Sequence, residues 1–346
     1  MLTETQLEEM RIMLDKAENP LFFFDADPDG LCSYLLLKKH YKKGVGVCLK
    51  TSPKNEVVYG AATAKHKPDL VVLLDKPIIS QETIDEMNVP ILWLDHHPPL
   101  ERNGVKYFNP MNGDKPDNRC TTYWAYRVTK ENPWIAITGI IADWQIPEQD
   151  ILEHDDSYPE LLGPTEGKTP PDFLFTTDYG TIVKMFSFAI KGSTDDMNDC
   201  IETLEHLTSP KDLLEQTTPE AQSIYEKYEK LNTGYDMLLN EALAQEKDGN
   251  VFVYTYPGGT HSYTGGLANE LLYKIDADIF VIGREKEGEV RMSVRSKANP
   301  ILPALRKALD AVNGNGGGHA MACGASVDMD RFSEFITILK KEYNAT

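Results

Sequence analysis

Three short apolar runs in the first hundred residues each end at an aspartate, and this pattern constrains the fold more than any other feature. The runs and the residues that follow them are Leu21–Phe24 before Asp25, Leu70–Leu74 before Asp75, and Ile91–Leu94 before Asp95. Short runs that are apolar throughout are typical of strands buried on both faces of a parallel sheet. Because residues 30–41 and 80–87 between them have helical patterns, the sequence predicts an α/β fold with a doubly wound, mostly parallel sheet.

Composition excludes several other classes of protein. Apolar residues make up 41% of the 346 residues, which is enough for packed cores and argues against disorder. No apolar run approaches the roughly 18 residues that cross a bilayer. The acidic start at 1–10 resembles no signal peptide, and the five scattered cysteines include no CxxC pair. We therefore expect a cytoplasmic protein without a disulfide framework, a zinc-thiolate site or a membrane partner.

Net charge limits the kind of nucleic acid that the chain can bind. Lys and Arg number 35 against 54 for Asp and Glu, which gives a formal charge of −19. Proteins that hold long nucleic acids need many basic residues at the phosphates, so this balance disfavours them. A nucleotide held at a metal site stays compatible with it, because the cations neutralise the phosphate.

Further along the chain, the pattern of apolar and polar residues indicates helices and then a second sheet. An acidic stretch, 148–171, is interrupted by Pro and Gly, and we interpret it as a solvated loop, with a lid over a site as the alternative. Helices are predicted over 181–207, 219–244, 267–274, 301–312 and 331–343. Strands are predicted over 251–254, 279–282 and 290–295, the last two forming a hairpin across 284–288. The predicted domains are a metal-binding catalytic domain (1–190), a helical linker (191–245) and a smaller α/β substrate-binding domain (246–346).

Carboxylates at the strand ends carry the functional signal. Asp25, Asp27 and Asp29 alternate, so they would share one face of an extended segment. In an open α/β sheet the carboxyl ends of the strands line the ligand crevice, where Asp75 and Asp95 would join them. Carboxylates gathered in one crevice repel one another unless a cation lies between them.

The ligand chemistry favours hard to borderline divalent ions. Carboxylate oxygens with one or two imidazoles, here His96 and His97, suit manganese or magnesium. The crowding favours two ions about 3.5–4 Å apart, with Asp75 and Asp143 as candidates to complete the pair. Taken singly, Asp29 or Asp75 also fits a helix N-cap, and a lone His is commonly structural. Their coincidence at three strand ends favours a metal site.

With these motifs the chain resembles the DHH phosphoesterase superfamily, whose name describes Asp95-His96-His97. The resemblance places Asp27 and Asp29 on the first metal motif, Asp75 on the second and Asp143 on the fourth. Many members carry a His where this chain has Phe23 or Asp25, and Asp25 is expected to serve as an oxygen ligand instead. The resemblance also assigns catalytic roles to His97, beside the phosphate, and to Asp95, which orients an imidazole.

The C-terminal part resembles the DHH-associated substrate domain. The residues that carry this likeness are Ser293 and Arg295 in a strand, and Gly316, Gly317, Gly318 and His319 in a glycine-rich loop. Glycines allow backbone N–H groups to approach a phosphate, and Arg295 and His319 can add charge-assisted hydrogen bonds. We therefore expect this loop to bind substrate.

The resemblance implies a hydrolase that uses two divalent ions, manganese preferred and magnesium possible, on phosphodiester bonds. The net charge favours short single-stranded oligonucleotides, hydrolysed to mononucleotides, as substrates. The alternatives are a RecJ-like single-strand-specific DNA exonuclease and a phosphohydrolase of cyclic dinucleotides or phosphoadenosine phosphate. A minor alternative is a non-catalytic replication-associated protein, and a plain nucleotide-binding protein would leave the carboxylates without a cation. The oligomeric state stays open, and a homodimer is one option.

Overall fold

The computed structural model describes residues 1–49, 56–113, 115–259 and 261–344. They form two compact units, Met1–Tyr228 and Glu229–Thr346. In chain order the first unit contains α1 (Glu4–Lys16), β1 (Pro20–Asp25), α2 (Pro28–Tyr41), β2 (Val45–Leu49), α3 (Val57–His66), β3 (Leu70–Leu74), α4 (Gln81–Met87), β4 (Ile91–Leu94), β5 (Val105–Phe108), α5 (Thr121–Thr129), α6 (Pro133–Ala142), α7 (Gln149–Leu152), η2 (Asp155–Ser157), η3 (Pro159–Leu162), α8 (Pro170–Thr176), α9 (Asp178–Ala189), α10 (Thr194–His206) and α11 (Pro210–Glu215). The helix α12 (Pro219–Leu243) crosses the limit between the units. The second unit continues with β6 (Val251–Pro257), α13 (Thr264–Lys274), β7 (Ile279–Lys286), β8 (Glu289–Ser296), α14 (Leu302–Val312), β9 (Asn315–Gly318), β10 (Ala322–Asp328), η4 (Met329–Arg331) and α15 (Phe332–Asn344).

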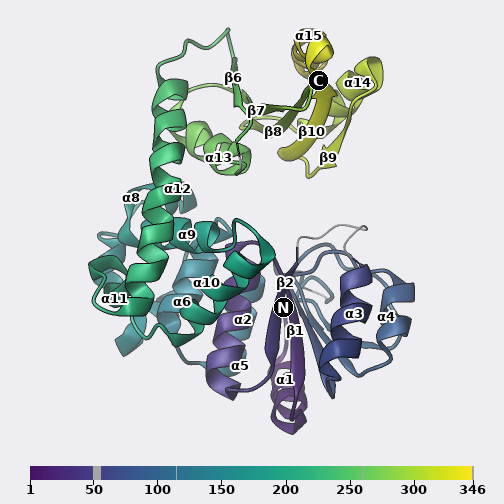
Figure 1. The fold of residues 1–346 in the computed structure, drawn as a ribbon, viewed down its shortest axis with the longest axis vertical. Helices are drawn as coiled ribbons and strands as arrows, with labels where there is room; N and C mark the ends of the chain where they lie inside the picture. Colours follow the sequence, from purple (N-terminus) through teal and green to yellow (C-terminus); the bar gives the residue numbers. More distant parts are fainter. Residues whose placement is uncertain (50–55, 114, 260, 345–346) are drawn as a thin grey trace. The chain divides into compact units, whose positions relative to one another are not determined.

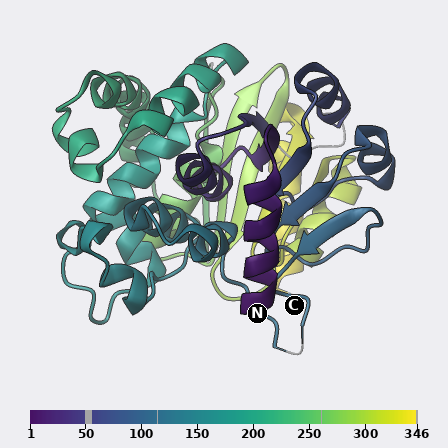
Figure 2. The same cartoon turned by 90° about the horizontal axis from the view of Figure 1, so that it is seen from below.

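The first unit is built on a five-stranded sheet in the order β2-β1-β3-β4-β5, and all of its strand pairs are parallel. The helices α2, α5 and α6 lie on one side of this sheet and α3 and α4 on the other (Figures 1 and 2). The predicted doubly wound α/β fold is therefore confirmed. The boundaries of the three predicted domains stay a prediction.

Burial on both faces explains why the central strands are apolar throughout. In β1, Phe22 and Phe24 belong to the core that contains α2, α5 and α6, while Leu21 and Phe23 pack with residues of α3 and α4. Successive side chains of a strand point to opposite faces, so each residue of β1 needs an apolar partner. The side chain of Phe23 contacts Tyr59 of α3, with ring centroids 4.6 Å apart.

The acidic segment 148–171 contains more structure than the predicted loop. It includes the short helices α7, η2 and η3, and α8 begins within it. Buried Ile151, Ser157 and Leu162 hold the segment against the first core. Charged residues alternate with these anchors, which hides the helical pattern from the sequence. A lid function for this segment stays a prediction.

The second unit has a mixed five-stranded sheet in the order β6-β7-β8-β10-β9, as expected for a smaller α/β domain. β7 and β8 form the predicted hairpin, and Glu287 and Gly288 at its turn both have positive φ, of +56° and +81°. Two central residues with positive φ define the turn that best fits the twist of paired strands. The helices α14 and α15 share a core with one face of the sheet, and α13 contacts β7 and β8.

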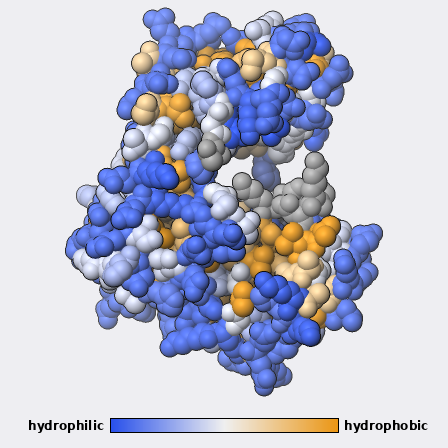
Figure 3. Space-filling view, in the orientation of Figure 1, coloured by the Kyte–Doolittle hydropathy of each residue, from blue (hydrophilic) through white to orange (hydrophobic). Residues whose placement is uncertain are grey.

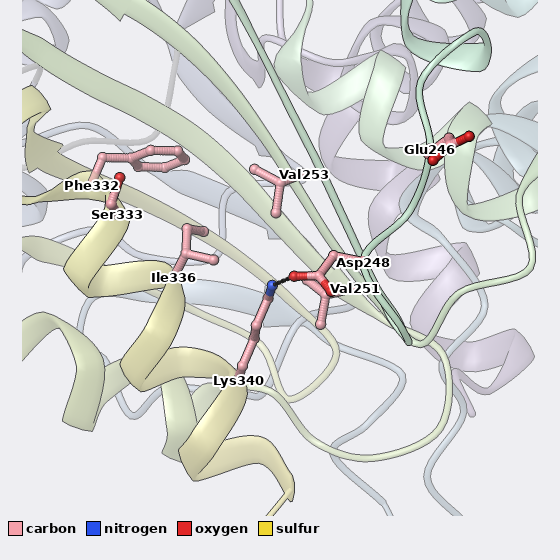
Figure 4. Close-up of a pocket in the computed structure, with 8 residues that line it drawn as sticks. All are labelled: Glu246, Asp248, Val251, Val253, Phe332, Ser333, Ile336 and Lys340. Carbon is pink, nitrogen blue, oxygen red and sulfur yellow. Dashed lines mark hydrogen bonds and ion pairs between the residues drawn. The ribbon is translucent and has the colours of Figure 1, made fainter.

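A cavity of about 310 Å³ lies between β6 and α15 in the second unit (Figure 4). Val251 and Val253 line one wall and Phe332 lines the other, while the Lys340 ammonium pairs with Asp248 at 2.5 Å. Val251 belongs to the core that packs under α14 and α15, and Val253 and Phe332 pack against that core.

The surface in Figure 3 is mostly hydrophilic, in agreement with the net charge of −19. Within the part of the chain that the structure describes, none of the helices combines the length and the apolar character needed to cross a membrane.

Candidate metal centre

The predicted carboxylates gather at one edge of the first sheet. β1, β3 and β4 are parallel neighbours, so their carboxyl ends lie side by side. The chain leaves β3 through Asp75 in the left-handed region, with φ of +56°. A non-glycine residue in this region is uncommon and is often found at functional sites. The buried Asp75 and Asp95 thus follow neighbouring strands at the same edge.

The start of α2 places the first two candidate ligands. Asp27 caps the helix, and its Oδ1 accepts a hydrogen bond from the backbone N–H of Gly30 at 2.9 Å. A Cβ atom on Gly30 would lie 2.6 Å from the carbonyl oxygen of Asp25, so only glycine lets α2 begin this close to β1. Buried Asp29 accepts hydrogen bonds from the backbone N–H groups of Thr121 and Thr122, at 3.0 and 2.8 Å. Asp29 therefore also satisfies the free N–H groups at the start of α5.

His96 faces three of the carboxylates. Its Nε2 atom lies 3.8 Å from Asp29 Oδ2, 3.6 Å from Asp75 Oδ1 and 3.9 Å from Asp143 Oδ2. These separations are too long for hydrogen bonds. Two donor atoms that each lie about 2.1 Å from one ion are roughly 3 to 4 Å apart, so the spacing fits a shared cation. The Nδ1 atom of His96 lies 3.3 Å from the carbonyl oxygen of Asn118, which favours a proton on Nδ1 and a lone pair on Nε2.

Burial and mutual repulsion together raise the pKa values of the carboxyl groups in the cluster. Burial, and then the charges of Asp25 and Asp29, raise the pKa of Asp27 to about 7. Burial and the charges of Asp29 and Asp27 raise the pKa of Asp143 to about 9. The pKa of Asp75 is raised well above its ordinary value, first by burial and then by its acidic neighbours. Negative charges held this close without a counter-ion are unfavourable, and a set of oxygen donors with one imidazole fits a divalent cation.

His97 has a different environment from His96. Its Nδ1 atom lies 2.9 Å from Asp95 Oδ1, and its backbone N–H donates to Asp95 Oδ2 at 3.2 Å. Asp95 is fully buried and also accepts hydrogen bonds from Tyr107 and Asn109. Burial lowers the pKa of His97, but the bond to Asp95 and the negative charges of Asp95, Asp29 and Asp27 together outweigh it and leave the pKa raised. The pair can therefore hold a proton on His97.

Asp25 differs from the other acidic residues because it pairs with a lysine. Its Oδ1 atom lies 2.6 Å from Nζ of Lys76, a residue that is completely buried. The role of Asp25 as a metal ligand stays a prediction.

The structure adds residues that sequence reasoning missed. Cys120, set aside with the other cysteines, is buried and brings its Sγ within 4.8 Å of carboxylate oxygens of Asp29 and Asp143. Gln145 donates to Asp143 at 2.8 Å and to the carbonyl of Asn118 at 2.9 Å, so it links Asp143 to the residue that holds His96. Neither Cys120 nor Gln145 belongs to a recognisable sequence motif, so their position at the site is visible only in the folded structure.

In the second unit, Arg295 and Ser293 extend from β8 toward the α13 side of the sheet. Arg295 Nε donates to Asn269 Oδ1 of α13 at 2.9 Å, and its Nη1 donates to the carbonyl of Cys323 at 3.2 Å. Val294 between them belongs to the core on the other face. The cavity of Figure 4 is on that opposite face, so it is separate from this pair.

The prediction of a glycine-rich loop at 316–318 is wrong in its local structure. Gly316, Gly317 and Gly318 lie in the edge strand β9, which pairs with β10 from Gly318↔Cys323 onward. A Cβ atom on Gly316 would lie 2.6 Å from the carbonyl of Gly324, whereas one on Gly317 would meet no atom within 4 Å. Strand pairing thus explains the glycine at 316 but not at 317. His319 follows, and its backbone N–H donates to Ala322.

The sequence matches two family models, the DHH family N-terminal domain over residues 21–151 and the DHHA1 domain over residues 248–345. The chain belongs to the DHH phosphoesterase superfamily. The predicted site residues of the first unit all lie in the DHH match, and those of the second unit all lie in the DHHA1 match. No curated protein matches the sequence.

Solved structures of other DHH proteins share the fold. RecJ from Thermus thermophilus in complex with Mn²⁺ has a TM-score of 0.69 and 18% identity, over 99% of this chain and 55% of that one. Another exonuclease RecJ, bound to manganese, has a TM-score of 0.65 and 17% identity, over 96% and 93% of the two chains. The pGpG-specific phosphodiesterase PggH from Vibrio cholerae has a TM-score of 0.54 and 15% identity, over 94% and 99%. This DHH protein therefore spans about half the length of the Thermus RecJ chain.

Proposed function

We propose that the protein hydrolyses phosphodiester bonds of short single-stranded oligonucleotides to mononucleotides, with two divalent ions and a preference for manganese. The observation that carries this proposal is His96 Nε2 facing Asp29, Asp75 and Asp143 at 3.6 to 3.9 Å. The imidazole favours manganese over magnesium, which prefers oxygen ligands alone. RecJ structures with manganese and with magnesium support the use of divalent ions.

The residues that would hold the ions are Asp27, Asp29, Asp75, His96 and Asp143. Bound divalent ions supply Lewis acidity, which lowers the pKa of water and offsets the charge of the phosphate. Around them, Asn118 fixes the ring of His96 through Nδ1, and Gln145 holds the Asp143 carboxylate. Such partners keep ligands oriented before binding, which reduces the reorganisation needed on loading.

His97 is the proposed proton donor to the leaving oxygen. Its Nδ1 is held by Asp95, and this bond stabilises the protonated ring. Phosphodiester cleavage between nucleotides releases an alkoxide, which needs a proton as the bond breaks. Asp95 is buried among Tyr107 and Asn109, so it orients His97 and does not itself meet the substrate.

The proposed substrate contacts of the second unit are Arg295, Ser293, Gly317 and His319. Arg295 is the charged member, and it is held by Asn269 and by the carbonyl of Cys323. The open space around Gly317 lets a phosphate approach the backbone of β9. A few contacts of this kind suit a short substrate, and the charge of −19 disfavours a long one.

A RecJ-like exonuclease acting on longer single strands is the second candidate. It is favoured by the likeness to RecJ over 99% of the chain and by the Asp25-Ala26-Asp27-Pro28-Asp29-Gly30 segment. The likeness to PggH, whose name specifies pGpG, supports a short substrate. Cyclic dinucleotides and phosphoadenosine phosphate are the third group of candidate substrates. The likeness to CDC45 from Entamoeba histolytica supports the non-catalytic alternative, with a TM-score of 0.52 and 11% identity. A non-catalytic protein would have no role for the aspartates that this chain keeps at the positions of the metal motifs.

The test compares hydrolysis of an end-labelled dinucleotide and a labelled single-stranded 30-mer at equal salt with manganese. We expect kcat/KM to be at least about tenfold higher for the dinucleotide. The variant Asp143→Asn should lose activity on both by about 10³-fold or more, because Asn keeps the volume but removes a charged ligand. Asp15→Asn, which changes an exposed carboxylate on α1, is the matched control and should keep full activity. Preference for the 30-mer would establish the RecJ-like alternative, and activity in Asp143→Asn would reject the site.

A further inference from the structure

Lys76, the residue after Asp75, is a buried cation at the edge of the metal centre. Its side chain has no exposed surface, and it lies between the carboxyl ends of three strands. Its ammonium donates to Asp25 Oδ1 and to the carbonyl oxygen of Leu49, each at 2.6 Å. Lysines are almost never fully buried unless they are paired, so these two bonds account for its position.

The strand order shows how far this side chain reaches. β1 lies between β3 and β2 in the sheet, so Lys76 extends from the end of β3 past Asp25 at the end of β1 to Leu49 at the end of β2. The backbone of Lys76 is fixed as well, because its carbonyl accepts a hydrogen bond from Trp93 Nε1 of β4 at 3.0 Å. Contacts to three neighbouring strands leave the ammonium little freedom to move.

The pairing with a lysine distinguishes Asp25 from the other carboxylates of the cluster, although its charge still raises the pKa of Asp27. Asp29, Asp75 and Asp143 all lie within 3.9 Å of His96 Nε2, and none of these contacts involves a lysine. Asp25 instead has a buried lysine partner supplied by the chain. A lysine that is fixed and dehydrated competes well with a metal ion for the same carboxylate, because moving it would leave a buried charge unpaired.

We infer that Lys76 is an internal counter-cation that occupies Asp25 and keeps it out of the metal-ligand set, an inference that rests on the proposed function. Lys76 is thus a positioning residue: it holds the ends of β1, β2 and β3 together and limits the negative charge that the metal ions must offset. The ligand set is then Asp27, Asp29, Asp75, His96 and Asp143. Asp25, the sixth residue suggested by sequence, serves as the lysine's anchor.

Two substitutions at this pair have opposite consequences for metal binding. Asp25→Asn removes a carboxylate that does not bind metal but leaves the buried Lys76 ammonium without that partner, so manganese affinity should fall by less than about tenfold. Lys76→Met removes the counter-cation and leaves the Asp25 carboxylate without its lysine beside the ions. Manganese should then bind at least about tenfold more tightly, because an additional carboxylate attracts it. The double variant, with a neutral pair, should return to wild-type affinity.

The experiment measures the dissociation constant for manganese from the electron paramagnetic resonance signal of the free ion, with no substrate present. Asp27→Asn is the positive control and should weaken binding by about tenfold or more. Lys39→Met is the matched lysine control. Lys39 is half-buried at the other end of α2, where it donates to the carbonyls of Glu205 and Leu207, so its loss should leave manganese affinity unchanged.

The possible results separate this inference from the proposed function. Weakening by Asp25→Asn as large as that by Asp27→Asn overturns the inference, as does unchanged or weaker binding in a folded Lys76→Met variant. If Lys76→Met does not fold, the double variant decides alone, because its pair is neutral: wild-type affinity supports the inference, and weakening as large as that by Asp27→Asn overturns it. A wild-type protein that binds no manganese would instead refute the proposed function itself.

Discussion

Replacing Asp143 by Asn should make the metal-free protein more stable and the manganese-bound protein less stable. Asp143 is the C-cap residue of α6, and burial followed by the charges of Asp29 and Asp27 raises its pKa to about 9. Asn keeps an oxygen that can accept the hydrogen bond from Gln145. The substitution therefore removes a carboxyl group that the metal-free fold must keep protonated or hold as a repelled charge, with little change in packing.

The size of the stabilisation follows from the pKa of Asp143, about 9 in the fold against an ordinary 3.8. At pH 7 the difference corresponds to roughly 4 kcal/mol, because each pH unit above the ordinary pKa contributes about 1.4 kcal/mol. The side chain is 30% exposed, so water screens part of the repulsion. We expect a gain of about 1 to 3 kcal/mol in the free energy of unfolding.

The pH dependence has a definite sign. A carboxyl with a raised pKa in the fold contributes stability that is complete below its unfolded pKa and is lost as pH rises through the folded pKa. For Asp143 the loss runs from about pH 4 to about pH 9 in the metal-free wild type. The Asn variant lacks this titration, so its free energy of unfolding should fall less steeply over the same range.

The assay is urea unfolding followed by circular dichroism at pH 5, 7 and 9, with EDTA and then with excess manganese. Manganese at a hundred times its dissociation constant should stabilise the wild type by about 2.7 kcal/mol. Manganese should stabilise the variant much less. The variant should therefore be the more stable protein in EDTA and the less stable one in manganese. An Asn variant that is less stable than the wild type in EDTA at pH 7 and 9 would refute the electrostatic reasoning.

Two further predictions concern the proton donor and the glycine strand. His97→Gln should lower kcat for a dinucleotide by about 10²-fold or more but change hydrolysis of a p-nitrophenyl nucleotide ester much less, because p-nitrophenolate leaves without a proton. Equal losses on the two substrates would count against His97 as the acid. Gly317→Ala should keep the melting temperature and raise KM, since its Cβ meets no atom within 4 Å, whereas Gly316→Ala should cost about 1 to 3 kcal/mol of stability through contact with Gly324. Unchanged KM in Gly317→Ala would remove this strand from the substrate contacts.

Burial of the central strands on both faces explains why the sequence predicts both these strands and the convergence of their aspartates. β1, β3 and β4 are buried on both faces, so their apolar runs are continuous and each run ends where the chain turns toward the crevice. The edge strands β2 and β5 escape this reasoning. They are partly exposed, and β2 contains Gly46, whose missing side chain makes room for the ring of Tyr34. In these strands Gly46 and Lys106 interrupt the apolar run that marks a buried strand.

The remaining parts of the site depend on contacts that span the fold. Lys76 meets Leu49, 27 positions earlier, and Thr121 donates to Asp75, 46 positions earlier. Neither pair has a spacing that the sequence could reveal. The resemblance to the DHH-associated domain predicts a loop at 316–318, but the glycines lie in β9, whose close pairing with β10 requires glycine at 316.

The most direct measurement is the anomalous diffraction of a crystal soaked in manganese. We expect two anomalous peaks within about 2.5 Å of ligand atoms from Asp27, Asp75, His96 and Asp143, and the peaks should be absent from an Asp143→Asn crystal or reduced in it. A map with no peak at this edge of the sheet, or with manganese bound only elsewhere, would contradict the assignment of a metal centre.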